Sequence, residues 1–210
     1  MMELSLEKIW KDIWKSHGAQ DELVIKYWYE IQKAYSAKTR YYHTFSHIQN
    51  MLESSIKFED KIDDIQNIQL SIFYHDVVYS GKRKDNEELS AELARKHLNK
   101  LNYPINKIEK CCNYILATKG HNPAHSDNDL NYFLDFDLQK LGSNWEEYDE
   151  YSKHIRQEYR FYPDIIYKPG RKKVLEHFLN LEKIFKSHEF YHLYEKQARL
   201  NLLMELKSIH

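Results

Sequence analysis

Apolar residues recur along this chain at steps of three and four positions, which is the spacing of one face of an α-helix. The first such stripe consists of Leu6, Ile9, Trp10, Ile13 and Trp14. Comparable spacing predicts further helices at residues 23–37, 47–58, 65–76, about 85–101, about 106–116, 130–138, about 145–160, 171–185 and 189–207. Because the apolar positions do not alternate as in a half-buried strand, the pattern predicts an all-α protein, folded as a compact helical bundle.

Polar stretches and prolines mark the predicted ends of these helices. Two polar segments, residues 79–87 and 118–128, are predicted to be loops, and the second is predicted to be functional. Asn106 is expected to cap the helix that it precedes. A break is predicted at Pro169 and Gly170, which would separate the two helices on either side.

Composition and charge narrow the class of protein. The 210 residues contain no visible repeat or linker, so a single domain spanning residues 1–210 is expected. Lysine and arginine (31) nearly balance aspartate and glutamate (32), which makes nucleic acid an unlikely partner. The N-terminal segment carries early acids and no long apolar run, so neither a signal peptide nor a membrane span is expected, and a cytoplasmic location follows. Neighbouring Cys111 and Cys112 are interpreted as reduced thiols.

The chemistry of the chain centres on His75 and Asp76, which end an apolar run that would otherwise be read as a buried helix. Burying an unpaired carboxylate costs several kcal/mol, so such a residue is usually hydrogen-bonded, paired or bound to a metal. Imidazole and carboxylate groups are both ligands of divalent ions, and His47 and Asp137 are plausible third and fourth ligands. The alternative is that these are hydrogen-bonded polar residues of the core.

Several segments of the chain resemble the HD superfamily of metal-dependent phosphohydrolases, in particular its predicted bacterial members of about this length. The segments that carry the resemblance are Tyr41-Tyr42-His43-Thr44-Phe45-Ser46-His47-Ile48, Tyr74-His75-Asp76-Val77-Val78-Tyr79, residues 85–91, Phe133-Leu134-Asp135-Phe136-Asp137-Leu138, residues 151–159 and residues 170–175. The resemblance implies an HD-type helical fold and a metal held by His47, His75, Asp76 and Asp137.

The same resemblance suggests roles for further residues. His43 and Asp76 are predicted to be catalytic, with His43 as the general acid that protonates the leaving oxygen; the alternative is that His43 caps the helix and orients a carboxylate. His121 and Glu87 are candidates for a second metal or for substrate. The roles of His125 and Glu88 stay open.

Three cations are candidates for contact with a substrate phosphate: Arg156, Arg171 and Lys119. An arginine can clamp phosphate oxygens through two parallel hydrogen bonds. Arg156 could instead pair with Glu158 or Asp149. Asp135 precedes Asp137 by two positions and would point to a different side of a helix, so it is interpreted as a supporting residue or a member of a salt bridge.

Together these features predict a metal-dependent phosphomonoesterase or phosphodiesterase. A divalent ion (Mn, Fe, Co, Ni, Zn or Mg) would be the cofactor, and a nucleotide or another small phosphorylated molecule the substrate. The alternatives are a non-catalytic metal- or nucleotide-binding module, an HD-fold di-iron oxygenase, and a helical protein without a site. A membrane partner is not expected, and a homodimer stays open.

Overall fold

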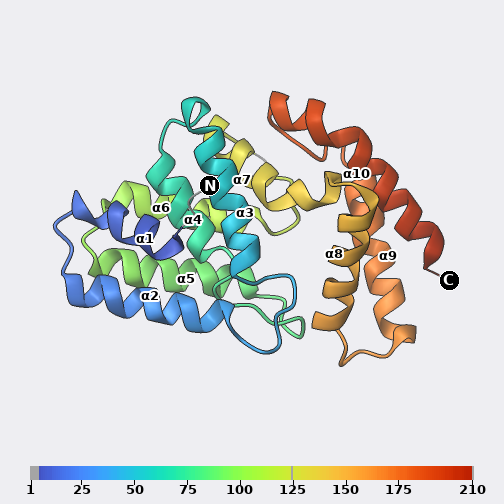
Figure 1. Cartoon of the computed structure of the whole chain (residues 1–210), viewed down its shortest axis with the longest axis horizontal. Helices are drawn as coiled ribbons and strands as arrows, with labels where there is room; N and C mark the ends of the chain where they lie inside the picture. The colour runs from blue at the N-terminus through green and yellow to red at the C-terminus, as the bar shows by residue number, and fades with distance from the viewer. Residues whose placement is uncertain (1–4, 124, 210) are drawn as a thin grey trace. The chain divides into compact units, whose positions relative to one another are not determined.

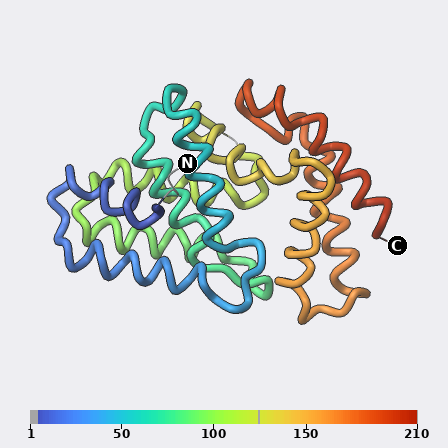
Figure 2. Tube along the Cα trace, in the orientation of Figure 1, coloured from blue at the N-terminus to red at the C-terminus, as the bar shows by residue number. Residues whose placement is uncertain are grey.

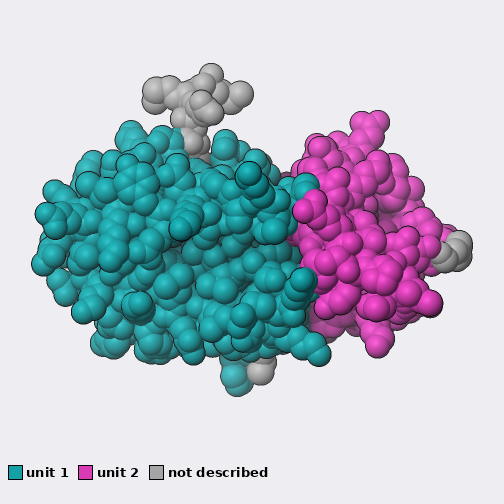
Figure 3. All heavy atoms as spheres, turned by 90° about the horizontal axis from the view of Figure 1, so that it is seen from below, with its two compact units in different colours: residues 1–125 teal, residues 126–210 magenta. Residues whose placement is uncertain are grey.

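Ten α-helices and two short 3-10 helices form within the residues that the computed structural model describes, 5–123 and 125–209 (Figure 1). These described residues contain no strand, so the all-α prediction is confirmed. The chain divides into two compact units, residues 1–125 and 126–210, which Figure 3 colours separately. The expected single domain stays a prediction, and residues 1–4, which belong to the N-terminal segment considered above, lie outside the described residues.

The first unit contains six α-helices and one 3-10 helix among its described residues. They are α1 (Leu6–Lys15), α2 (Asp21–Tyr35), α3 (Phe45–Lys57), η1 (Glu59–Lys61), α4 (Ile65–Tyr74), α5 (Asn86–Lys100) and α6 (Ile105–Ala117). The chain turns back on itself after α1, and α2 packs against it (Figure 2). The side chains of Ser5 and Asp64 accept hydrogen bonds from backbone N–H groups in the first turns of α1 and α4, so both helices begin at a capping residue.

Helix α4 forms the centre of this unit because it packs against α3, α5 and α6. Its apolar residues Ile68, Leu70 and Phe73 are fully buried. Two of its four polar residues, Asn67 and Ser71, are buried as well, and the hydroxyl of Ser71 donates to the carbonyl oxygen of Asn67 (2.8 Å). Seven of the ten residues of α4 are buried, and the residues that follow its last turn therefore begin in the interior of the unit.

Within its described residues, 126–209, the second unit contains four α-helices and one 3-10 helix. They are α7 (Asn128–Leu138), η2 (Gln139–Gly142), α8 (Trp145–Glu158), α9 (Asp164–Asn180) and α10 (His188–Ser208). Helix α10 packs against α9 and η2. The side-chain amide of Asn201 on α10 donates to the carbonyl oxygens of Leu141 (2.9 Å) and Ser143 (2.8 Å), which fixes the turn that follows α7 to this helix.

Three sequence-based expectations about helix ends are wrong. Helix α9 runs through Pro169 instead of breaking there. Proline removes one hydrogen bond to the carbonyl four residues earlier, that of Ile165, and this residue is 83% exposed, so water can replace the lost donor. The helix then ends at Asn180 rather than residue 185, because the N–H groups of Ile184 and Phe185 donate to the carboxylate of Glu195.

The start of α6 also differs from the expectation. Pro104, not Asn106, occupies the N-cap position, and its carbonyl oxygen accepts hydrogen bonds from Lys107 (2.9 Å) and Ile108 (3.0 Å). The cap position needs no donor of its own, so proline is tolerated there. The loop expected between α6 and α7 is confirmed at its described residues, since α6 ends at Ala117 and α7 begins at Asn128.

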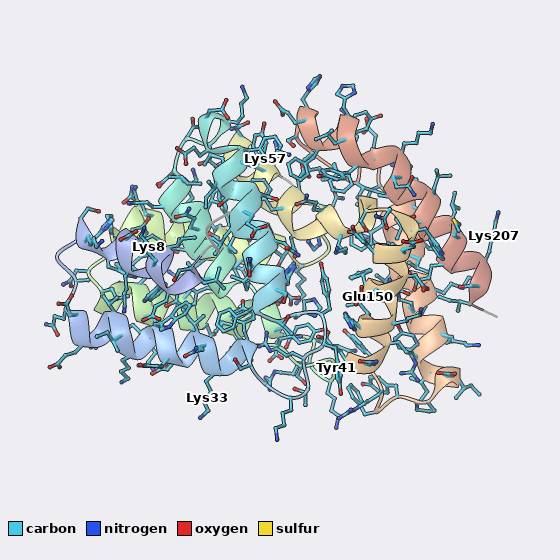
Figure 4. The ribbon with its side chains drawn as sticks, in the orientation of Figure 1. Lys8, Lys33, Tyr41, Lys57, Glu150 and Lys207 are labelled. Atoms are coloured by element: carbon cyan, nitrogen blue, oxygen red, sulfur yellow. The ribbon has the colours of Figure 1, made fainter. Side chains whose placement is uncertain are left out.

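Lysines lie in the last turn of several of these helices. Lys33, Lys57 and Lys207 occupy the last turns of α2, α3 and α10, and Figure 4 labels all three. A positive charge at this end of a helix interacts favourably with the partial negative charge of its free carbonyl groups. Among the described helices, none is both long and apolar enough to cross a membrane.

Replacing Gly142 with alanine is expected to destabilise the protein. A Cβ at this position would lie 2.5 Å from the Cβ of Tyr194 and 2.9 Å from its carbonyl oxygen, and the backbone of α10 cannot move away without repacking the unit. Overpacking of this kind costs about 1–3 kcal/mol of unfolding free energy, measurable by chemical denaturation. Gly170→Ala is the matched control: nothing lies within 4 Å, and helical alanine should stabilise the protein by about 0.5–1 kcal/mol. Equal effects of the two changes would contradict the packing explanation.

Candidate metal centre

His75 caps the C-terminal end of α4 and is 1% exposed. Its Nδ1 atom lies 2.9 Å from the carbonyl oxygen of Ile72, one turn earlier in the same helix. Since a carbonyl oxygen can only accept, Nδ1 carries a proton, and in the neutral imidazole Nε2 carries the lone pair. A backbone carbonyl that orients an imidazole in this way is typical of histidine ligands to metals.

Two further side chains bring ligand atoms to Nε2 of His75. The Nε2 atom of His47, on the first turn of α3, lies 3.3 Å away. The Oδ2 atom of Asp76 also lies 3.3 Å away. His47 is 4% exposed and the Asp76 side chain is 14% exposed, so water reaches little of either. Nε2 of His75 thus has a second imidazole nitrogen and a carboxylate oxygen as neighbours, which are atoms of the kinds that bind divalent cations.

One group of three potential metal ligands was found among the described residues. It consists of His47 and His75 of the first unit and Asp137 of the second. Asp137 lies on the last turn of α7. The group could hold a metal ion, and its nitrogen and oxygen donors suit Mn, Fe, Co, Ni or Zn more than a purely oxygen-coordinated ion. This bears out the coarser part of the sequence-based expectation, a His and Asp cluster able to hold a metal.

His43 reaches the same cluster from a loop. Helix α3 begins at Phe45 and its N-cap is Thr44, so His43 precedes the helix. The two rings are nevertheless 5.9 Å apart between centroids, and Nε2 of His43 lies 3.7 Å from Oδ2 of Asp76. Thr44 occupies the N-cap position of α3, so the alternative is wrong in having His43 cap this helix, and its other part, that His43 orients a carboxylate, stays a prediction.

Two residues that the sequence did not single out hold this arrangement. Arg40 is 8% exposed and donates to backbone carbonyl oxygens on both sides of the cluster, and the hydroxyl of Tyr35 accepts the N–H of Asp76 (3.3 Å). Arginine and tyrosine are common on surfaces, and neither lies within the His-Asp motif. Their position just before the Tyr41-Tyr42-His43 segment is the only signal that the sequence offered.

Helix α5 fixes the segment that follows Asp76. The hydroxyl of Ser90 accepts the N–H of Val78 (3.1 Å), and the side chain of Asn86 bonds both backbone groups of Ser80. The neighbouring Glu87 is half-buried, and its pKa is raised, first by burial and further by the negative charge of Asp76. The carboxyl of Glu87 is therefore within electrostatic reach of the cluster, and its predicted role toward a second metal or substrate stays a prediction.

The loop after α6 contributes the remaining candidates of the first unit. The Lys119 ammonium pairs with Glu88 and donates to the carbonyl oxygen of Lys84 (3.1 Å). His121 has a positive φ of 52°, a backbone conformation that residues other than glycine rarely adopt. His125 is exposed. The functional roles proposed for these residues stay predictions.

The two arginines of the second unit are engaged in structural contacts. Arg156 pairs with Asp164, rather than with Glu158 or Asp149, and also donates to the carbonyl oxygens of Tyr159 and Tyr162. These bonds hold the turn between α8 and α9 together. The predicted contact of Arg156 with phosphate stays a prediction.

Arg171 makes the second of these structural contacts. It is 7% exposed and forms two parallel hydrogen bonds with Glu205, of 2.7 and 2.8 Å. The bidentate face that would suit a phosphate is therefore occupied by a carboxylate. Its predicted contact with phosphate stays a prediction.

Asp135 is a buried anchor for the start of α10. Its carboxylate accepts the N–H groups of Lys186 and Ser187 (both 2.7 Å) and the hydroxyl of Ser187 (2.6 Å), and it is fully buried. These partners are backbone amides and a hydroxyl. Asp135 thus ties α7 to the first turn of α10 by hydrogen bonds instead of the salt bridge suggested by the sequence.

Asp135 should make stability depend on pH. Burial raises the pKa of its carboxyl to about 7, against the opposing effect of its hydrogen bonds. Its ordinary value is near 4, so between these values the folded state binds the extra proton and stability falls as pH rises. This loss amounts to roughly 4 kcal/mol over the window. Asp135→Asn mimics the neutral form, so its melting temperature relative to wild type should rise between about pH 4 and pH 8. The exposed Asp60→Asn serves as control, and a constant difference for Asp135→Asn would contradict the assignment.

No protein-family model, no curated protein and no solved structure matches this chain. The resemblance to HD phosphohydrolases therefore rests on the sequence motifs alone.

Proposed function

We propose that this protein is a metal-dependent phosphohydrolase that acts on a nucleotide or another small phosphoester. The observation that carries the proposal is that Nε2 of His75 lies 3.3 Å from both Nε2 of His47 and Oδ2 of Asp76, while its Nδ1 bonds the carbonyl of Ile72. Hydrogen-bonded core residues would not need the lone pair of a buried imidazole to face a carboxylate oxygen and a second imidazole. In the proposal, Asp137 completes the ligand set.

When bound at these residues, a divalent ion would lower the pKa of a coordinated water and neutralise charge on the phosphoryl group. His47, His75 and Asp76 would supply atoms that bind the ion, the Nε2 atoms of the two histidines and Oδ2 of Asp76. His43 donates a proton from its imidazole to the leaving oxygen, and its Nε2 atom lies 3.7 Å from Oδ2 of Asp76. His47 and His75 are buried, which limits the access of bulk water to their ligand nitrogens.

Among the three predicted phosphate-binding cations, Lys119 is the best placed for the role. Its side chain is 50% exposed, whereas that of Arg171 is 6% exposed and paired with Glu205. An exposed ion pair such as Lys119–Glu88 contributes about 0–1 kcal/mol, so a phosphate can compete for the ammonium. Lys119 also lies close enough to Glu87 to influence the pKa of that carboxyl, which in turn responds to the charge of Asp76.

Elemental analysis of the purified protein and a phosphate-release screen test the proposal. We expect a transition metal in the wild type, and phosphate release from nucleotides or an aryl phosphate when Mn, Co, Ni, Zn or Mg is supplied. Asp76→Ala should lower turnover by about 1,000-fold or more, since it removes a ligand and a charge next to His43. Asp60→Ala, on an exposed 3-10 helix, should leave turnover unchanged.

Each alternative gives a different result in the same experiment. Bound metal without turnover of any phosphoester would indicate a binding module. Iron on purification together with oxygen consumption would indicate an oxygenase. Equal turnover by wild type and Asp76→Ala would contradict the proposed mechanism.

A further inference from the structure

Arg40 is a buried cation on the loop between α2 and α3, the loop on which Figure 4 labels Tyr41. Its guanidinium donates to three backbone carbonyl oxygens, those of His43 (3.2 Å), Asp76 (2.7 Å) and Val77 (3.0 Å). The guanidinium is planar and its donors point in fixed directions. These bonds therefore hold the loop that carries His43 at a set distance from the segment that carries Asp76.

The main chain of Asp76 is held at a second point by Tyr35. The Asp76 N–H donates to the Tyr35 hydroxyl (3.3 Å), and this hydroxyl donates to the carbonyl oxygen of Phe73 (3.2 Å). Both backbone polar groups of Asp76 are thus bonded to side chains from the end of α2 and the loop that follows it. Its carboxylate is positioned by a fixed backbone.

The imidazole of His43 is positioned by an aromatic neighbour. The ring of Tyr79 lies 4.1 Å from it between centroids, at an interplanar angle of 32°. The guanidinium carbon of Arg40 lies 5.5 Å from the centre of the same tyrosine ring, within the range of a cation–π contact. Tyr79 therefore contacts both the side chain of His43 and the arginine that anchors its backbone.

We propose that Arg40 and Tyr79 are positioning residues that set the orientation of the His43 imidazole relative to Asp76. Arg40 fixes the two backbones, and Tyr79 fixes the ring. The inference rests on the proposed function, because the orientation matters only if His43 transfers a proton there. A proton donor on a loop, outside any helix, depends on such neighbours, since small displacements of a catalytic group reduce rate steeply.

Four variants test the role of Tyr79: Tyr79→Leu, Tyr79→Phe, His43→Ala and the Tyr79→Leu/His43→Ala double variant. We expect Tyr79→Leu to lower kcat by about 10- to 100-fold while its metal content stays at the wild-type level. Tyr79→Phe keeps the ring and should keep kcat within about two-fold. In the double variant, the loss of the Tyr79 ring should cost nothing beyond the His43→Ala change, because Tyr79 acts through His43.

A purely structural role of Tyr79 would give a different pattern. It would lower kcat in the His43→Ala background as much as in the wild type, or would reduce metal content and melting temperature together. Either result, or a kcat of Tyr79→Leu equal to that of the wild type, would overturn the inference.

Proton NMR of the His43 ring separates this inference from the proposed function. The Tyr79 ring should shift the imidazole proton signals of His43, and this shift should disappear in Tyr79→Leu and persist in Tyr79→Phe, whether or not the protein turns over a substrate. An unchanged spectrum in Tyr79→Leu would overturn the positioning role. A wild type that shows the ring shift and binds metal, but hydrolyses no phosphoester, would overturn the proposed function and the catalytic part of the inference with it.

Discussion

The His75→Ala variant is expected to lose its bound metal, with an affinity lower by about 100-fold or more. Nε2 of His75 is the atom closest to both other ligands of the first unit, at 3.3 Å from His47 and 3.3 Å from Asp76. Without it, the remaining groups would have to approach one another from α3 and from the end of α4. Elemental analysis after dialysis against a weak chelator, and titration with Zn or Mn, would measure the loss.

His97→Ala provides a matched control for this change. His97 is also a buried imidazole of the first unit, 2% exposed, but it stacks on Tyr27 and bonds the hydroxyl of Tyr74 and the carboxylate of Glu30. Both variants remove a buried ring and should lose similar stability, yet His97→Ala should retain the metal. Metal retained by His75→Ala, or lost equally by both variants, would contradict the assignment of the centre.

The Glu205→Ala variant is expected to lose about 3–5 kcal/mol of unfolding free energy. Glu205 accepts two hydrogen bonds from the guanidinium of Arg171 and one from the hydroxyl of Tyr148 (2.5 Å), and all three side chains are buried. Removing the carboxylate leaves a buried cation without its counter-ion, which costs far more than the net contribution of the pair. Chemical denaturation would measure the difference.

Two further variants separate the charge effect from the loss of packing. Arg171→Met combined with Glu205→Leu removes both charges and should restore most of the lost stability. Glu176→Ala breaks the exposed pair with Lys172 (3.9 Å) and should change stability by less than about 0.5 kcal/mol. If the double variant is as unstable as Glu205→Ala, the uncompensated charge is not the cause. If it is stable but has lost phosphohydrolase activity, the predicted phosphate contact of Arg171 gains support.

The helix content followed from local patterns of apolar residues. The surroundings of individual residues decided where that prediction failed. The three- and four-residue spacing of apolar positions is a property of each segment, so the sequence was sufficient to predict an all-α chain and a helix that leads into His75 and Asp76. Pro169 was misinterpreted because its cost depends on whether the freed carbonyl can reach water. The end of α9 was misplaced because Glu195, on the next helix, binds the amides that would otherwise continue it.

The candidate site shows the same division between local and long-range information. Ligand types and their order along the chain are visible in the motif, but the meeting of His47 with His75 joins residues 28 positions apart. Arg40 and Asp76 are 36 positions apart, and Asp135 and Ser187 are 52. No periodicity encodes such pairs, because they depend on how the helices pack.

By itself, the sequence determined the helices, the buried ending of α4 at His75 and Asp76, and the residue types that could bind a metal. Only the tertiary structure decided which atoms meet: the orientation of His75 by its own helix, the placing of His43 by Arg40 and Tyr79, and the pairing of Arg171 with Glu205. The physical reason is that amphipathic spacing acts within a single helix, whereas the geometry of a site is set by side chains that reach across from other elements.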